Sequence, residues 1–110
     1  MNLYLTKKLA DTLKGRLDYE LQPDHPVPGL FMWRAHYVQE QGQKFVVFMN
    51  EATRFTIVIN EAMVAKLKQL PDLFFTTLRD TLIGIHIHPT AIERYIQDLG
   101  EISYFKETLI

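Results

Sequence analysis

The sequence predicts an α+β fold in which a small antiparallel sheet is packed by three or four helices. The sheet prediction depends on a central three-strand meander over about residues 30–59, where segments rich in Val, Ile, Phe and Thr are separated by turn signals. The helix prediction depends on apolar residues that recur at helical spacing before and after the meander. With 110 residues, of which 47% are hydrophobic, we expect a single domain over 1–110 with one core.

The chain begins with a short apolar segment, Asn2–Leu5, which we expect to form a first strand at the edge of the sheet. Thr6 then suits the N-cap of a helix over Lys7–Lys14, and Gly15 suits its end. The following segment, Leu21–Gly29, contains three prolines and reads as a loop.

The meander consists of three predicted strands, Leu30–Gln39, Lys44–Met49 and Thr53–Ile59. We expect two-residue loops at Gln41-Gly42 and Glu51-Ala52, because this register brings apolar residues of all three strands onto one face. The predicted core face consists of Phe31, Trp33, Ala35, Tyr37, Val46, Phe48, Phe55, Ile57 and Ile59.

The opposite face of the meander mixes basic, polar and apolar side chains. It carries Arg34, His36, Arg54, Thr56, Val38, Phe45, Val47, Met49 and Val58. A sheet face that meets only water is usually more polar than this. Two explanations stay open: a helix of the same chain covers this face, or a partner does.

The second half of the chain predicts three helices and one strand. Helices are expected over Glu61–Leu70, Asp72–Ile83 and Pro89–Leu99, since each carries an apolar stripe and ends near a Pro or Gly. Between the last two, Ile85–His88 is expected to be extended because a proline follows it. Ile102–Phe105 is expected to form a last strand at an edge of the sheet.

Several short motifs resemble a family of uncharacterised bacterial domains that is known only as a domain of unknown function. These motifs are Thr6-Lys7-Lys8-Leu9, Trp33 in the first strand of the meander, and Phe48-Met49-Asn50 followed by Thr53-Arg54-Phe55. The resemblance covers most of the chain. It implies a bacterial or phage-borne cytoplasmic protein and supplies no activity.

The composition excludes several classes of chemistry. Cysteine is absent, which rules out disulfides, thiolate catalysis and Cys-based metal sites. The single serine, Ser103, lacks the glycine-flanked elbow of a serine hydrolase. No apolar run is long enough to span a membrane, and the net charge of −1 gives no bulk attraction to nucleic acid. We therefore expect a cytoplasmic protein without a cofactor or a membrane contact.

The leading functional hypothesis is a non-enzymatic binding or regulatory module that acts through protein–protein interaction, as an inhibitor or an accessory protein. Its predicted interaction face is formed by Arg34, His36, Met49 and Arg54. Arginine beside apolar and aromatic residues is common at protein interfaces. If this face is exposed, a symmetric homodimer is an alternative to a different protein partner.

A rival hypothesis is a small metal-dependent hydrolase that uses His86 and His88. Residues two apart on a strand project to the same face, so both imidazoles would reach one ion. A third ligand would have to come from elsewhere in the fold. The alternative is that these histidines only flank a turn.

A third hypothesis places an anion or a nucleic acid at the predicted first helix. Thr6, Lys7 and Lys8 would hold a phosphate or carboxylate at its N-terminus. Together with Lys14 and Arg16, these lysines would give a basic patch for nucleic acid, with an affinity that falls steeply with salt. The alternative is that the lysines are solvated or paired with nearby carboxylates.

Overall fold

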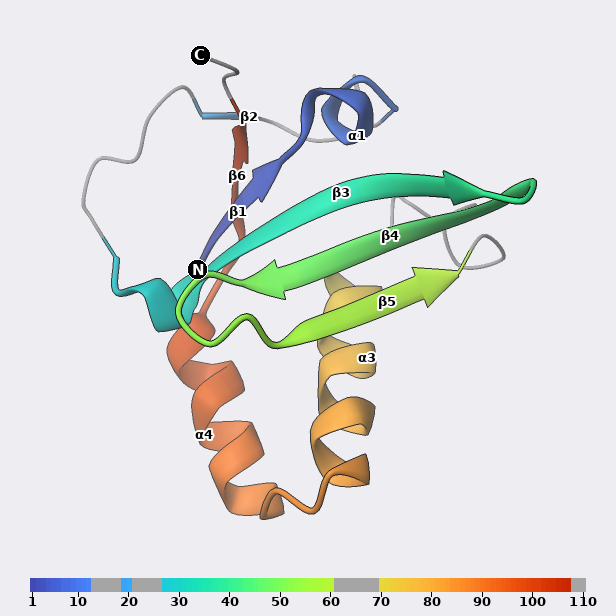
Figure 1. Cartoon of the computed structure of the whole chain (residues 1–110). Helices are drawn as coiled ribbons and strands as arrows, with labels where there is room; N and C mark the ends of the chain where they lie inside the picture. The colour runs from blue at the N-terminus through green and yellow to red at the C-terminus, as the bar shows by residue number, and fades with distance from the viewer. Residues whose placement is uncertain (13–18, 21–26, 61–69, 108–110) are drawn as a thin grey trace.

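The computed structural model describes residues 1–12, 19–20, 27–60 and 70–107, and these form a mixed α/β fold (Figure 1). Within this part of the chain, six strands form one sheet in the order β2-β6-β1-β3-β4-β5. The elements are β1 (Asn2–Leu5), α1 (Lys7–Thr12), β2 (Tyr19–Glu20), the 3₁₀ turn η1 (Gly29–Phe31), β3 (Met32–Glu40), β4 (Gln43–Asn50), β5 (Thr56–Asn60), α3 (Leu70–Gly84), α4 (Pro89–Leu99) and β6 (Ser103–Lys106).

The sheet has a parallel part and an antiparallel part. Strand β1 pairs in parallel with both β3 and β6, and β6 pairs in parallel with β2. Strands β3, β4 and β5 form the predicted antiparallel meander. The prediction of a small, purely antiparallel sheet was wrong, and so was the placement of the first and last strands at its edges. Leu3 and Leu5 of β1 are fully buried, because both belong to the core that the helices cover.

The meander register confirms the predicted core face although one loop was predicted wrongly. The β3–β4 turn is Gln41-Gly42, with Glu40 opposite Gln43, as predicted. The β4–β5 loop is longer than the predicted two residues. The backbone N–H of Asn50 donates to the carbonyl of Phe55 at 2.9 Å, so Phe55 lies opposite Asn50. This shifts the pairing by two residues, and an even shift leaves the side chains of the paired strand residues on their predicted faces.

The core lies between the sheet and the helices α3 and α4, which lie side by side against one face of the sheet (Figure 1). Phe74 of α3 is fully buried, and its ring centroid lies 5.2 Å from that of Trp33 and 5.1 Å from that of Phe48. The same core takes in Leu9 and Ala10 of α1. Edge-to-face and tilted aromatic contacts of this kind add to the stabilisation that burial alone gives.

The helices of the second half match the predicted apolar stripes. Helix α4 has the predicted bounds, and it ends at Gly100 with a positive φ of 63°. Helix α3 begins at Leu70, so Pro71 lies in its first turn, where proline is tolerated, and does not break the helix. In the described part of the chain, no helix combines the length and apolarity needed to cross a membrane.

Some predicted elements fall outside the described residues. They are the helix at 61–70 except for its last residue, the end of the first helix at 13–15, and most of the loop at 21–29.

Candidate functional site

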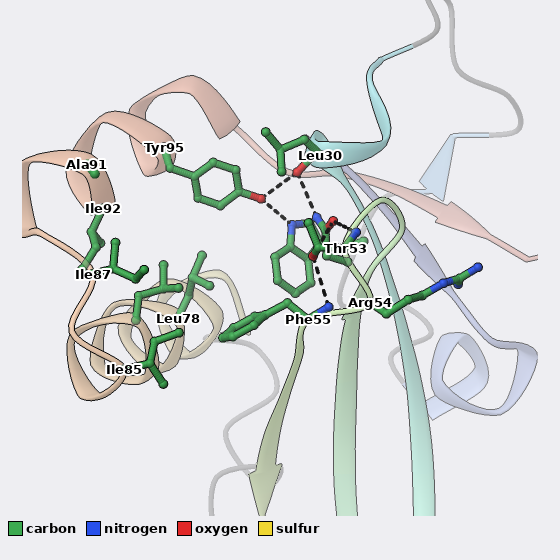
Figure 2. Close-up of a pocket in the computed structure, with 13 residues that line it drawn as sticks. Leu30, Thr53, Arg54, Phe55, Leu78, Ile85, Ile87, Ala91, Ile92 and Tyr95 are labelled. Atoms are coloured by element: carbon green, nitrogen blue, oxygen red, sulfur yellow. Dashed lines mark hydrogen bonds between the residues drawn. The ribbon is translucent and has the colours of Figure 1, made fainter.

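An apolar pocket of about 430 Å³ opens between the β4–β5 loop, the helices α3 and α4, and the turn that joins these helices (Figure 2). Strand and loop residues form one wall: Leu30, Trp33, Asn50, Thr53, Arg54 and Phe55. Residues of the helices and their turn form the other: Leu78, Leu82, Ile85, Ile87, Ala91, Ile92 and Tyr95. A concave, mostly apolar hollow of a few hundred Å³ is the usual form of a binding site.

The turn between α3 and α4 places two isoleucines at the pocket. Between them, His86 adopts a positive φ of 67°, which reverses the chain direction. Its N–H donates to the carbonyl of Ile83, and the N–H of Ile87 donates to that of Leu82, both at 3.0 Å. These bonds hold the turn against the end of α3, so Ile85 and Ile87 both line the pocket (Figure 2).

A chain of hydrogen bonds joins the two walls at one end of the pocket. The indole N–H of Trp33 donates to the Tyr95 hydroxyl oxygen at 3.2 Å, and this hydroxyl donates to the Leu30 carbonyl at 2.7 Å (Figure 2). Burial raises the pKa of the Tyr95 hydroxyl above its usual value, which keeps it protonated as a donor. These polar groups therefore hold the walls together and are already partnered.

Asn50 organises the loop that carries the other wall. It is 1% exposed, and its side-chain oxygen accepts from the N–H groups of Ala52 and Thr53, each at 3.0 Å. Its side-chain nitrogen donates to the Leu30 carbonyl at 2.9 Å. The loop then passes through Arg54, which has a positive φ of 62°. The side chain of Arg54 extends away from the pocket (Figure 2).

The mouth of the pocket is lined by large apolar side chains that remain open to solvent. Leu30, Ile85 and Ile87 are 43%, 52% and 40% exposed, respectively. Ile83, which precedes the turn and lies outside the lining, is 55% exposed. We call these four residues the apolar rim. Large apolar side chains left open to solvent beside a hollow are typical of interaction sites.

The predicted interaction residue Arg34 is engaged within the chain. Its guanidinium forms an ion pair with Glu51 at 2.7 Å and a second with Glu107. It also lies over the ring of Tyr4, 5.6 Å from the centroid, and Tyr4 stacks on Phe105. Arg34 therefore ties β3 to the β4–β5 loop and to the residue that follows β6.

The other three residues of the predicted interaction face do not stay together. His36 and Met49 lie on the second sheet face, as predicted, and both are partly buried. Arg54 belongs to the β4–β5 loop and not to a strand, because that loop is longer than predicted. It lines the apolar pocket, whereas Arg34, His36 and Met49 do not.

The predicted anion site at the start of α1 has mixed charge. Thr6, Lys7 and Lys8 line a hollow together with Asp11 and Glu107. The Thr6 hydroxyl is buried and makes no hydrogen bond within the described residues, so the predicted side-chain cap was wrong. Anion binding here stays a prediction, and the additional basic residues of the nucleic-acid hypothesis, at 14 and 16, lie outside the described residues.

The strand geometry on which the predicted metal pair depended was wrong. Residues 85–86 form a turn, and His86 has a positive φ. His86 and His88 therefore lack the strand geometry that would project both side chains to one face. The Nδ1 atom of His88 accepts a hydrogen bond from the Thr90 N–H at 3.1 Å, so this side chain caps α4. Within the described residues, no group of three or more His, Asp or Glu side chains is placed to hold a metal ion.

The pocket was not predicted from the sequence. Phe55 and Tyr95 were assigned only to the core, and Ile85 and Ile87 to an extended connector. The available signal was the pair of isoleucines in a short segment between two helices. Apolar residues in a turn have no helix stripe or strand face to bury them, so they indicate an exposed apolar site.

Fold and site together define a mixed α/β domain with an apolar pocket at one end of its helical layer. The chain belongs to the family described as a domain of unknown function (DUF6933), whose model matches residues 2–108. This confirms the resemblance to a family of unknown function, while a bacterial or phage origin stays a prediction. No curated protein and no solved structure matches the chain.

Proposed function

We propose that the protein is a non-enzymatic binding module that acts through protein–protein interaction, and that its pocket takes an apolar side chain of the partner. The observation that carries this proposal is the apolar rim: Leu30, Ile85 and Ile87 stay 40–52% exposed around a hollow with an apolar lining. An exposed surface of this composition is unfavourable in water unless a partner covers it for part of the time.

The rim favours a protein over a small ligand as the occupant. A ligand that fills the pocket covers the lining, but Ile83 lies outside the lining and is 55% exposed. Ile83 directly follows the lining residue Leu82 in the chain, so a protein surface that inserts one side chain and packs around it has room to cover Ile83 as well. This matches the arrangement in protein interfaces, where a central anchor residue is surrounded by contacts that exclude water.

The partnering of the polar groups favours an apolar anchor. The Trp33 N–H, the Tyr95 hydroxyl and the Leu30 carbonyl already bond to one another, so they offer a polar occupant little compensation for its lost hydration. Full burial of a Leu, Ile or Phe side chain contributes about 1.5–3 kcal/mol. An aromatic or branched aliphatic side chain is therefore the expected anchor.

An inhibitory or accessory role in a bacterium or a phage completes the proposal. A chain of 110 residues with an apolar docking pocket suits a subunit that covers part of the surface of another protein.

A selection from a display library of random peptides tests the proposal. Peptides selected on the wild-type protein should share an aromatic or branched aliphatic residue. Ile87→Asp should weaken their binding at least tenfold, or about 1.4 kcal/mol. Val58→Thr makes an exposed apolar side chain outside the lining polar and serves as the control, because it should leave peptide affinity unchanged. Equal affinity for the wild type and Ile87→Asp would contradict the proposal.

A further inference from the structure

One large exposed apolar side chain lies apart from the apolar rim. Val58, in the middle of β5, is 52% exposed. Strand β5 is the last strand in the sheet order, and among the described strands it pairs only with β4 (Figure 1). The pocket proposal does not account for this exposed valine on a strand that has one neighbour among the described strands.

The hydrogen-bond pattern shows which backbone groups of β5 face outward. The N–H of Asn50 donates to the Phe55 carbonyl, so this carbonyl points toward β4, whereas the Phe55 N–H bonds to the Thr53 hydroxyl. In an antiparallel pair this direction alternates along the strand. Ile57 and Ile59 therefore also face β4, whereas Thr56 and Val58 direct their N–H and C=O groups away from the sheet.

Strand β5 lacks the features that normally protect a sheet edge. Its sequence, Thr-Ile-Val-Ile-Asn, contains no charged residue, no proline and no glycine. Edge strands of monomeric proteins usually carry a lysine, a proline or a bulge that prevents pairing with another chain. An edge without these features is suited to accept a further strand.

We propose that this strand is β5 of a second copy of the chain, in an antiparallel pair that continues the sheet across a two-fold axis. In the pairing centred on Val58, Val58 lies opposite its own copy and Ile57 lies opposite Ile59. The backbone N–H and C=O of Val58 point away from its own sheet in both copies. The two Val58 residues can therefore exchange both N–H···O=C bonds, as a hydrogen-bonded pair requires.

The absence of charge on β5 favours a second copy as the partner. A two-fold axis places identical residues opposite or near each other, and like charges in directly opposite positions destabilise a strand pair. Two valines meet at the axis instead. On the same sheet face, each Val58 also lies beside Val47 of β4, so the pair extends an apolar strip across both copies.

Sedimentation equilibrium over a concentration series tests the proposal. The wild type should reach twice the mass of one chain, and Val58→Lys should raise the dimer dissociation constant at least tenfold. Val58→Thr keeps a β-branched residue without charge and should still dimerise. A wild-type mass of one chain throughout the series, or a dimer that Val58→Lys leaves intact, overturns the proposal.

Cysteine cross-linking tests the register, because the natural chain has no cysteine. Across the two-fold axis, the two Cα atoms of residue 58 should be about 5.5 Å apart, within the range that a disulfide spans. The two Cα atoms of residue 56 should be roughly 14 Å apart, because the two-fold axis displaces them from each other by four residues along the strand direction. Val58→Cys should therefore cross-link under mild oxidation and Thr56→Cys should not. Equal cross-linking of both variants, or none with Val58→Cys, overturns the proposed register.

Discussion

The pocket end of the molecule and the second sheet face around Arg34 differ in which of their side chains are left without a partner. Around Arg34, the charged groups are paired with one another: its guanidinium meets Glu51, Glu107 and the ring of Tyr4. At the pocket, the polar groups of Trp33, Tyr95 and Asn50 are also paired, but the apolar rim is open to solvent. One region has satisfied its strongest interactions within the chain, whereas the other has not.

This difference teaches that a charged residue on a surface is not by itself evidence of a binding site. An arginine with two carboxylate partners must lose them before it binds another molecule, which costs free energy. An exposed isoleucine at a hollow gains free energy as soon as another apolar surface covers it. The pocket is therefore favoured over the Arg34 face as the binding site, and the following variants test this difference between the two regions.

Asn50→Ala should have the largest effect on stability. The substitution removes the acceptor for the N–H groups of Ala52 and Thr53, and it also removes a donor to Leu30. Since each buried group left unsatisfied costs about 1–3 kcal/mol, the free energy of unfolding should fall by about 3 kcal/mol. Urea denaturation followed by tryptophan fluorescence measures this change.

Thr53→Ala is the matched control for Asn50→Ala because it alters the same loop at an exposed position. Its hydroxyl bonds only to the Asn50 side-chain oxygen and the Phe55 N–H among the described groups. We expect a loss below about 1 kcal/mol. If the two variants lose equal stability, Asn50 does not organise the pocket wall.

Tyr95→Phe should have an intermediate effect. It leaves the Trp33 indole N–H without its acceptor, while the Leu30 carbonyl keeps its bond from Asn50. The free energy of unfolding should fall by about 1–2 kcal/mol, and the indole N–H resonance of Trp33 should move. An unchanged resonance would show that the two side chains are not bonded in solution.

The same variant has a predicted pH dependence. Burial raises the folded-state pKa of Tyr95 above its unfolded value, so the unfolded chain loses this proton first as the pH rises. The stabilisation by the protonated hydroxyl is fully present below about pH 10 and declines as the pH rises through the folded-state pKa. The stability difference between wild type and Tyr95→Phe should therefore be constant at neutral pH and shrink in alkali.

Arg34→Ala should have the smallest effect. The Arg34 side chain is 40% exposed, and exposed ion pairs contribute about 0–1 kcal/mol, less at high salt. We expect a loss below about 1 kcal/mol that decreases as salt is added, with peptide binding at the pocket unchanged. A large loss of peptide binding would instead place the partner on the Arg34 face.

Much of the fold follows from local patterns in the sequence. The meander faces, the α4 bounds and the α3 stripe are predictable because periodicity and terminal Gly or Pro residues carry the signal. The parallel pairing of β1 is not, because a four-residue apolar segment contains no information about which distant strands flank it. Strand β2, with two residues, was missed for the same reason.

The candidate site was less predictable than the fold. Arg34, His36 and Met49 were correctly assigned to one sheet face, but the sequence does not reveal that Glu107, distant along the chain, pairs with Arg34. The pocket forms where residues from Leu30 to Tyr95 meet, and its shape depends on the positive φ of His86 and of Arg54. Neither residue type requires that conformation, so the two turns could not be read from the sequence.

The most direct test of the pocket uses Trp33, the single tryptophan of the chain, which lines it. The indole N–H resonance would be followed by NMR during titration with the N-acetyl amides of leucine, isoleucine and phenylalanine, and with that of glutamine as a polar control. The pocket account predicts saturable, weak shifts of this resonance with the apolar amides, absent with glutamine and reduced in Ile87→Asp. A resonance that stays fixed with all four compounds, or that moves equally with glutamine, would contradict the claim that the pocket binds apolar side chains.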